Sequence, residues 1–401
     1  MARPASGGDR VFVAAVGFAQ ICAWGSLFYS FPLIGEAMSA EFGWTKTEIY
    51  VAATIGLLLA ALAALPVGAA IDAGRGRIVM SGASAMAALL LVAWSQVETL
   101  ASFYLVFALI GCLQAAALYE PAFAVAARRF GPSGSRRAIT ALTLWGGFAS
   151  TVFIPLIQVL MDAHGWRVAL MVLAAINFAC AVLYAAVIDP ARDAAPEPPA
   201  EGEAELLAGR RAVAWALGRP VFWALGVAFV AYAAAFSSLT FHIYPMLLER
   251  GLGTAGTVAV LTVIGPAQVA GRIVVWLAAG RAPVRTVGAV IVAVFPLALF
   301  GFAFAPAEVT VIAAIAAAYG AANGMMTIVR GLAVPEMVGR HAYGAINGAL
   351  TAPVLVVQAV APLGAAMIWT AYGGYTAVMV AMLAASLVLA ASFWTAAFLS
   401  R

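Results

Sequence analysis

Two ionisable residues lie inside stretches that are otherwise apolar: Glu120 within LYEPAFA and Arg272 within GPAQVAGRIVV. Glu120 precedes Arg128 by eight residues and Arg272 precedes Arg281 by nine, so in helices each is about 12–13 Å from a charged end. A charge at the bilayer centre costs about 2.5–3.5 kcal/mol on insertion scales, and such residues therefore usually mark a substrate or proton pathway. These two residues are the first candidates for chemistry.

Arg272 suits the binding of an anion, because its guanidinium stays protonated and offers a planar fork of donors that matches a carboxylate. The alternative is a buried ion pair with Glu120 that only holds two parts of the chain in register. The two roles can also alternate. If a substrate carboxylate takes Arg272, Glu120 loses its partner and gains a proton more readily, so Glu120 is the candidate proton carrier. Its alternative role is a helix kink beside Pro121.

Further polar and aromatic residues could shape a pocket around these charges. His242 could bind substrate or relay a proton, although a lone His near a helix end is more often a satisfied core residue. Tyrosines offer hydroxyls on an apolar wall, which suits a small organic anion, with ordinary packing as the alternative for each. Intramembrane amides can instead join helices. The predicted substrate-binding residues are Arg272, His242, Tyr29, Tyr119, Tyr319 and Asn347, with Trp145, Gln268 and Asn323 as further candidates.

The composition places these residues in a membrane protein. Of 401 residues, 65% are hydrophobic and 9% are charged, and the mean hydropathy is +1.02. Soluble proteins have about 45–50% apolar and about 25% charged residues, so soluble enzymes and nucleic-acid-binding proteins are excluded. The three cysteines lie in apolar runs and are interpreted as core thiols. The sequence has no phosphate-binding GxxxxGK[ST] loop and no HExxH motif, and we expect no cofactor, no metal and no enzymatic activity.

Twelve apolar stretches are long enough to cross a bilayer as helices, which takes about 20 residues. They are 11–35, 48–71, 77–96, 100–127, 137–161, 167–188, 220–247, 254–280, 286–305, 308–329, 343–369 and 375–399. With a cytoplasmic N-terminus, 17 arginines fall inside and only Lys46, Arg167 and Arg250 fall outside. Because positive charge gathers on the cytoplasmic side, we expect an all-α membrane protein with twelve helices and both termini in the cytoplasm.

A polar segment divides the twelve stretches into two groups of six. Residues 189–219 hold six acidic residues, four prolines and four arginines, a composition typical of a linker. We therefore expect an N-terminal six-helix bundle over 1–188, a cytoplasmic linker over 189–219 and a C-terminal six-helix bundle over 220–401. Weak echoes relate the halves: Ile55-Gly56 and Ile264-Gly265 are 209 residues apart, as are Gly111 and Gly320. Such pseudo-symmetric halves place a substrate site between them at mid-membrane.

The segment 68–77, GAAIDAGRGR, is similar to the cytoplasmic signature of the major facilitator superfamily, in which an Asp follows a Gly by four residues and precedes Gly and basic residues. The resemblance covers essentially the whole chain. It implies the twelve-helix major facilitator fold and a cytoplasmic gate of Asp72, Arg77 and Arg128, with Arg129 as another partner for Asp72. The family usually has Arg directly after the Asp, where this chain has Ala73, which weakens the expected gate. A basic loop that only sets topology is the alternative.

Four motifs resemble the oxalate/monocarboxylate transporter branch of that superfamily: YEPAFA, FHIYP, GPAQVAGR and YGAANGMMTIVRG. In that branch an Arg on the eighth helix holds the substrate carboxylate, which the resemblance assigns to Arg272. Oxalate exchangers carry a Lys on the eleventh helix, whereas this chain has Asn347, Thr351 and Gln358 there. A single guanidinium favours a monocarboxylate over a dicarboxylate.

The sequence therefore predicts a secondary active transporter of the bacterial cytoplasmic membrane that moves a small organic anion with a proton by alternating access. Arg272 binds the carboxylate and Glu120 carries the proton. The expected partners are this substrate, the proton and the lipid bilayer, with no nucleic acid, and we expect a monomer. Two alternatives stay open: a proton-driven efflux antiporter for amphiphilic or cationic compounds, and a membrane receptor on the same fold that does not transport.

Overall fold

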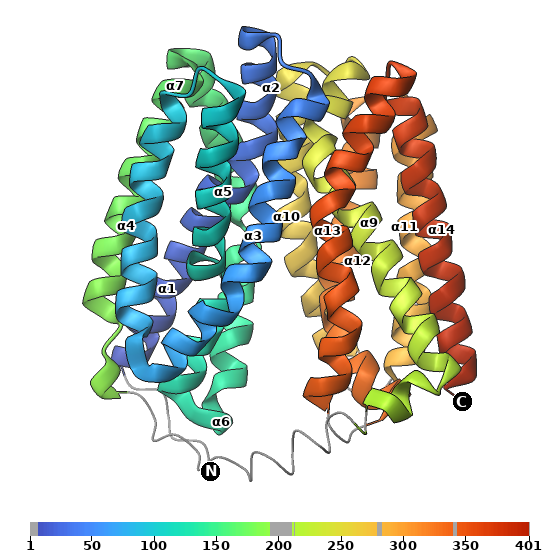
Figure 1. Cartoon of the computed structure of the whole chain (residues 1–401). Coiled ribbons are helices and arrows are strands. Elements are labelled where there is room, and N and C mark those ends of the chain that lie inside the picture. Colours follow the sequence, from blue (N-terminus) through green and yellow to red (C-terminus); the bar gives the residue numbers. More distant parts are fainter. Residues whose placement is uncertain (1–6, 193–210, 212, 279–282, 340–342, 401) are drawn as a thin grey trace. The chain divides into compact units, whose positions relative to one another are not determined.

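The computed structural model describes residues 7–192, 211, 213–278, 283–339 and 343–400, with side chains except at 7, 65, 72, 132–137, 275–278, 335 and 343–345. Eleven helices in the described residues are long and apolar enough to cross a membrane (Figure 1). The chain divides into two compact units, Met1–Glu197 and Pro198–Arg401. Most of the expected linker 189–219 lies outside the described residues, and each unit is considered separately below.

Unit 1 is built from antiparallel helices joined by short turns. Its elements are α1 (Gly7–Trp24), the π-helical turn η1 (Gly25–Tyr29), α2 (Ser30–Phe42), α3 (Lys46–Ala70), the π-helical turn η2 (Ile71–Arg75), α4 (Gly76–Ser95), α5 (Leu100–Ala117), α6 (Tyr119–Gly146), α7 (Ala149–Val187) and the 3₁₀ turn η3 (Pro190–Arg192). The first three follow one another without a gap, so the N-terminal membrane stretch runs over Gly8–Phe42.

Glycines mark the points where long apolar helices of unit 1 change direction. Gly131 interrupts α6 with φ 62°, and Gly165 interrupts α7 with φ 81°, a region that glycine enters without a Cβ clash. The apolar stretch Ala138–Val187 has 50 residues, about 75 Å of helix against a hydrocarbon layer of about 30 Å. It covers two expected spans, 137–161 and 167–188, and Gly165 lies between them. The total of twelve crossings and the side of each terminus stay predictions.

The reversal between α2 and α3 follows from its local sequence. Gly43 ends α2 in the left-handed conformation, with φ 69°, as glycine commonly does at a helix C-terminus. Thr45 and Glu48 then form a capping box: the Glu48 backbone N–H donates to Thr45 Oγ1 at 3.2 Å, and the Thr45 N–H donates to Glu48 Oε2 at 2.8 Å. These contacts satisfy N–H groups that the first turn of α3 leaves unpaired.

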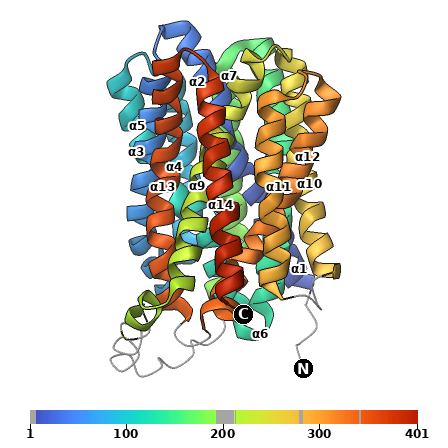
Figure 2. The same cartoon turned by 90° about the vertical axis from the view of Figure 1, so that its right-hand side faces the viewer.

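Unit 2 has the same kind of architecture (Figures 1 and 2). Its helices are α9 (Pro220–Glu249), α10 (Gly253–Ala278), α11 (Val284–Phe304), α12 (Val309–Ala333) with the π-helical turn η4 (Val334–Val338), α13 (Tyr343–Tyr372) and α14 (Tyr375–Leu399). Proline begins α9 at its first position, where a missing N–H costs no helical hydrogen bond.

Helices pack backbone to backbone at glycines in both units. A Cβ on Gly111 of α5 would lie 2.0 Å from the Gly56 carbonyl oxygen of α3, and a Cβ on Gly320 of α12 would lie 2.7 Å from the Ile264 carbonyl oxygen of α10. Without a hydrophobic driving force between helices in lipid, such close approach is a main source of packing energy. The residues that are repeated 209 positions apart in the sequence thus lie at similar contacts, between α3 and α5 in unit 1 and between α10 and α12 in unit 2.

Gly324 provides a test of this packing. A Cβ there would lie 2.1 Å from the Gln268 carbonyl oxygen, so Gly324→Ala must push α12 away from α10. We expect a destabilisation of about 1–3 kcal/mol, typical of overpacking, measured by thermal unfolding of the purified protein. Gly331→Ala is the matched control on the same helix, since no atom lies within 4 Å of the added Cβ. Equal melting temperatures for the two variants would contradict the close contact.

Candidate functional site

Glu120 lies just after a break in the membrane-spanning chain. α5 ends at Ala117, Leu118 is extended with φ −85° and ψ −152°, and α6 begins at Tyr119. The expected span over 100–127 is thus present within the apolar stretch Leu100–Gly131, but its helix is interrupted at Leu118. Proline has no N–H to donate to the carbonyl four residues earlier, so Pro121 leaves the Ala117 carbonyl without its helical partner.

A side chain from α1 takes the place of that missing donor. Buried Gln20 donates from Nε2 to the Ala117 carbonyl oxygen at 2.8 Å and to the Tyr184 hydroxyl at 3.1 Å. In hydrocarbon a broken helix persists only where other groups satisfy its freed backbone. The break leaves Glu120 in the first turn of α6, with its side chain exposed on unit 1.

The two tyrosines predicted in unit 1 meet on one tryptophan. The Trp24 ring centroid lies 5.0 Å from that of Tyr119 and 6.5 Å from that of Tyr29. Tyr119 also stacks on Phe123 at 5.1 Å and donates from its hydroxyl to the Thr143 carbonyl at 3.4 Å. The structure therefore assembles an aromatic cluster beside Glu120. Trp24 was not predicted from the sequence. The one feature that could have pointed to it is its position inside a membrane span.

Trp145 of α6 also contacts α1, at Gly17. A Cβ on Gly17 would lie 2.5 Å from the Trp145 ring, which is 38% exposed. The absence of a side chain at Gly17 thus makes room for this ring.

Arg272 lies half-buried on α10 in unit 2. Tyr232 of α9, which was not predicted from the sequence, is buried and donates a short hydrogen bond to Asn323 Oδ1 of α12. The guanidinium carbon of Arg330 is 5.7 Å from the centroid of the Tyr232 ring and 5.8 Å from that of the Phe229 ring. The guanidinium of Arg330 therefore lies near this tyrosine.

The other predicted residues of unit 2 lie on neighbouring helices. Tyr319 of α12 is buried, with ring centroids of Phe295 and Phe302 at 5.8 Å and 6.2 Å in edge-on geometry. Asn347 lies on α13 and is partly exposed. Tyr319 and Asn323 share α12 one turn apart, so the structure groups Tyr319 with the Tyr232 and Arg272 region.

His242 is fully buried and joins three helices of unit 2. Its Nε2 lies 2.8 Å from the Pro362 carbonyl oxygen of α13, and its Nδ1 lies 2.9 Å from the Tyr375 hydroxyl of α14. A carbonyl only accepts, so Nε2 donates, and in the neutral ring Nδ1 accepts from Tyr375. Glu249 strengthens the same junction by accepting from Trp369 Nε1 and from the Tyr375 backbone N–H, both at 2.8 Å. A substrate role for His242 stays a prediction.

The residues of the expected gate are only partly described. Arg129 pairs with Asp9 at 3.2 Å, and its guanidinium carbon lies 4.3 Å from the Phe12 ring centroid, so it joins α6 to α1. Arg128 is half-buried, and its Nη2 lies 3.6 Å from the position of a Cβ on Gly74. It thus reaches the η2 turn that carries position 72. The Asp72 side chain lies outside the described residues, and Arg77 is exposed.

No group of three or more His, Cys, Asp or Glu side chains in the described residues could hold a metal ion. The residues around Glu120 in unit 1 offer carboxyl, hydroxyl and aromatic groups, and the residues around Arg272 in unit 2 offer guanidinium, hydroxyl and aromatic groups.

The His242 junction predicts a stability effect. His242→Phe keeps a ring of similar shape but removes the two buried hydrogen bonds, to the Pro362 carbonyl and to the Tyr375 hydroxyl. A hydrogen bond contributes about 0.5–1.5 kcal/mol to stability, so we expect a fall in the melting temperature of the purified protein. His164→Phe is the control, because His164 is exposed. Unchanged stability in His242→Phe would show that the junction does not hold the helices together.

Comparison with known proteins agrees with this architecture. Residues 16–362 match the family model described as Major Facilitator Superfamily. Human monocarboxylate transporter 11 is 31% identical over 290 residues, which are 69% of this chain and 58% of that protein. Rat monocarboxylate transporter 13 is 27% identical over 339 residues, 82% of this chain and 73% of that protein. The chain thus spans less than two thirds of the length of the human relative.

Solved structures share the fold at low sequence identity. The nucleoside transporter NupG matches with a TM-score of 0.75 and 15% identity, over 98% of this chain and 99% of that one. A bacterial homologue of the human lysosomal transporter Spinster, inward-facing and unoccupied, matches with a TM-score of 0.74 and 13% identity, over 98% of each chain. The described residues form helices, eleven of them long and apolar enough to cross a membrane, and the family match covers most of the chain, so this chain belongs to the major facilitator superfamily of membrane transporters.

Proposed function

We propose that the chain is a secondary active transporter that moves a small monocarboxylate together with a proton across the bacterial cytoplasmic membrane. In this proposal the chain crosses the membrane twelve times, both termini are cytoplasmic, and the two units, separated by the 189–219 linker, alternate access to a central site. The observation that carries the proposal is Arg272, a half-buried guanidinium inside an apolar helix that is long enough to cross a membrane. The likeness to monocarboxylate transporters 11 and 13 supports the substrate class.

Arg272 binds the carboxylate in this mechanism. Gly271 packs against the α12 backbone, since a Cβ there would lie 2.3 Å from the Ala321 carbonyl oxygen. The next residue points about 100° away around the helix, so Arg272 is directed away from the tightest part of the α10–α12 contact. Tyr319, Asn347 and His242 complete the polar lining contributed by unit 2.

Glu120 carries the proton. Its carboxyl is exposed on unit 1, at a helix break of the kind that lines transport pathways in membrane proteins. Tyr29 and Tyr119 supply the aromatic wall with Trp24, and the wall meets the carbon skeleton of the substrate. Asp72, Arg77 and Arg128 form the cytoplasmic gate, which the position of Arg128 near Gly74 supports.

Ligand-induced stabilisation tests the carboxylate site. Purified protein is heated with small monocarboxylates, dicarboxylates or amphiphilic cations, and we expect stabilisation by a monocarboxylate of about 2.7 kcal/mol at a hundredfold excess over Kd. Arg272→Gln abolishes the part of this stabilisation that comes from the central site, because the bidentate partner of the carboxylate is lost. Arg167→Gln is the control, since Arg167 pairs with Glu41 at 2.7 Å in an exposed position. Stabilisation by cations alone that survives Arg272→Gln would overturn the proposal in favour of an efflux antiporter.

Proteoliposomes test the proton role of Glu120. A pH gradient drives uptake of the stabilising monocarboxylate by the wild type, whereas Glu120→Gln keeps exchange of labelled for unlabelled substrate and loses gradient-driven uptake, because the glutamine cannot take a proton. Glu98→Gln, an exposed residue of unit 1, retains both activities. If Glu120→Gln still accumulates substrate when a pH gradient is imposed, a group other than Glu120 carries the proton. A wild type that binds the substrate but exchanges none would indicate a receptor.

A further inference from the structure

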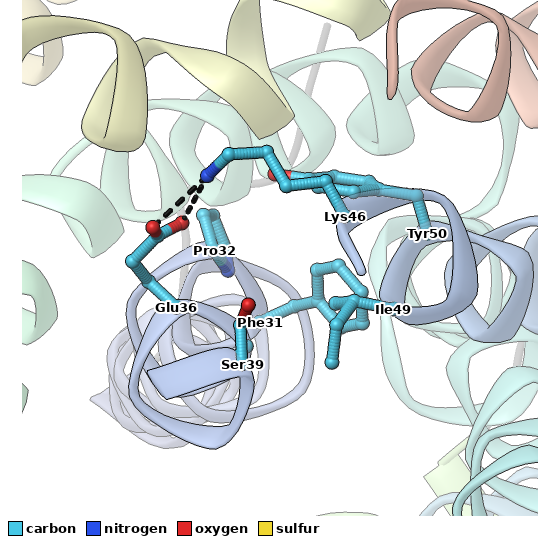
Figure 3. A pocket seen from close by; sticks show the side chains of 8 residues that line it. Phe31, Pro32, Glu36, Ser39, Lys46, Ile49 and Tyr50 are labelled. Carbon is cyan, nitrogen blue, oxygen red and sulfur yellow. Dashed lines mark hydrogen bonds and ion pairs between the residues drawn. The ribbon is translucent and has the colours of Figure 1, made fainter. Parts of the chain in front are cut away.

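The single lysine of the chain forms a buried ion pair in unit 1, away from the residues described above. Among 21 basic residues only Lys46 is a lysine. Its Nζ lies 2.8 Å and 2.9 Å from the two carboxylate oxygens of Glu36, so the ammonium meets both (Figure 3). Lys46 is 8% exposed, whereas the side chain of Glu36 is 35% exposed. The cation is therefore buried and its carboxylate partner reaches the surface.

A small pocket between α2 and α3 surrounds the pair (Figure 3). Apolar side chains contribute to its lining, among them Phe31, Ile49 and the buried ring of Tyr50. An ammonium at the base of apolar walls recognises a carboxylate that carries a short carbon chain, since the charge binds the carboxylate and the walls cover the carbon atoms.

Two other carboxylates near this end of unit 1, Glu41 and Glu48, have partners of their own. Glu41 accepts from Arg167 Nη1 at 2.9 Å and from Trp166 Nε1 at 2.6 Å, and Glu48 caps the N-terminus of α3. Glu36 thus acts as the local carboxylate for Lys46.

A buried ammonium needs an anionic partner, because removal of one member of a buried pair leaves an uncompensated charge. A free carboxylate has the same binding group as Glu36 and can take its place if Glu36 turns outward to solvent. Glu36 competes strongly, since its attachment to the neighbouring helix gives it a high effective concentration. In the structure Glu36 holds the position on the ammonium that a free carboxylate would take.

We propose that Lys46 is a second carboxylate-binding site, where a cargo carboxylate replaces Glu36 on the ammonium. It extends the proposed function, since it takes the same class of ligand at the end of unit 1 opposite the N-terminus. In the proposed topology that end faces outward, so the site binds the cargo before it reaches Arg272.

The single lysine makes the test direct. Full-length protein labelled with [ε-¹³C]lysine has one lysine side-chain NMR signal, from Lys46, which is followed in detergent during titration with acetate or pyruvate. We expect a saturable shift with both anions and none with methylammonium. In Glu36→Gln the same shift occurs at about tenfold lower acetate concentration or less, because the tethered competitor is gone. Glu41→Gln is the matched control, and its titration follows that of the wild type.

Arg272→Gln separates the two proposals, because it removes the central site and leaves the Lys46 response in place. If pyruvate stabilises the protein through Arg272 while the Lys46 signal stays fixed in both the wild type and Glu36→Gln, the second site is overturned and the pair is a structural tie between α2 and α3. If acetate shifts the Lys46 signal but no carboxylate stabilises the protein through Arg272, the proposed function fails and the second site stands. The wild-type titration decides the matter even if Glu36→Gln does not fold.

Discussion

In the hydrocarbon layer a polar backbone group or a charge without a partner costs free energy. Most features of this structure provide such partners. Regular helices satisfy nearly all of the backbone within one segment. Where a proline removes a donor, another helix must supply one. Gln20 does so for the carbonyl of Ala117, which precedes Pro121 by four residues. The break in α5–α6 is therefore not an independent feature, because it requires a buried amide on α1. The helix interruption beside Glu120 and the buried Gln20 in the first span therefore depend on each other.

The same layer removes the hydrophobic drive that would hold helices together in water, so contact at small residues takes its place. In unit 1 α3 meets α5 at Gly56 and Gly111, and in unit 2 α10 meets α12 at Ile264 and Gly320. These contacts fix the rotation of each helix as well as its distance from the next. Gly271 faces the α12 backbone, and Arg272 is placed by the helical turn that follows. The glycine pattern thus determines where the intramembrane guanidinium points.

Much of the helical fold was predictable from the sequence because a span of about 20 apolar residues is a local property. The break at Leu118 was not predicted, since a proline within a membrane span is often tolerated without one. Partners were harder to predict than elements: His242 bonds Pro362 and Tyr375, which are 120 and 133 residues away. Trp24 and Tyr232 were missed for a related reason, because an aromatic residue in an apolar run resembles ordinary core packing. Glu120 and Arg272 were proposed as site residues because a charge in such a run is rare.

The two units treat their positive charges differently, and this difference bears on the cargo. In unit 1 Arg129 and Lys46 each lie against a carboxylate of the same unit, which cancels most of their field. In unit 2 Arg250 donates to the backbone carbonyls of Phe302 and Ala305, and Arg330 lies over the rings of Phe229 and Tyr232. Carbonyls and rings carry only partial charges, so these guanidinium charges are not cancelled.

In the proposed mechanism the charge of Arg330 adds to that of Arg272, because both lie in unit 2 and a field falls off slowly in surroundings of low dielectric constant. The proposed anion is then attracted by both guanidinium groups, whereas a cation is repelled by both. This asymmetry is the physical argument for proposing an organic anion rather than an amphiphilic cation as the cargo, and it gives Arg330 a role that needs no contact with the anion.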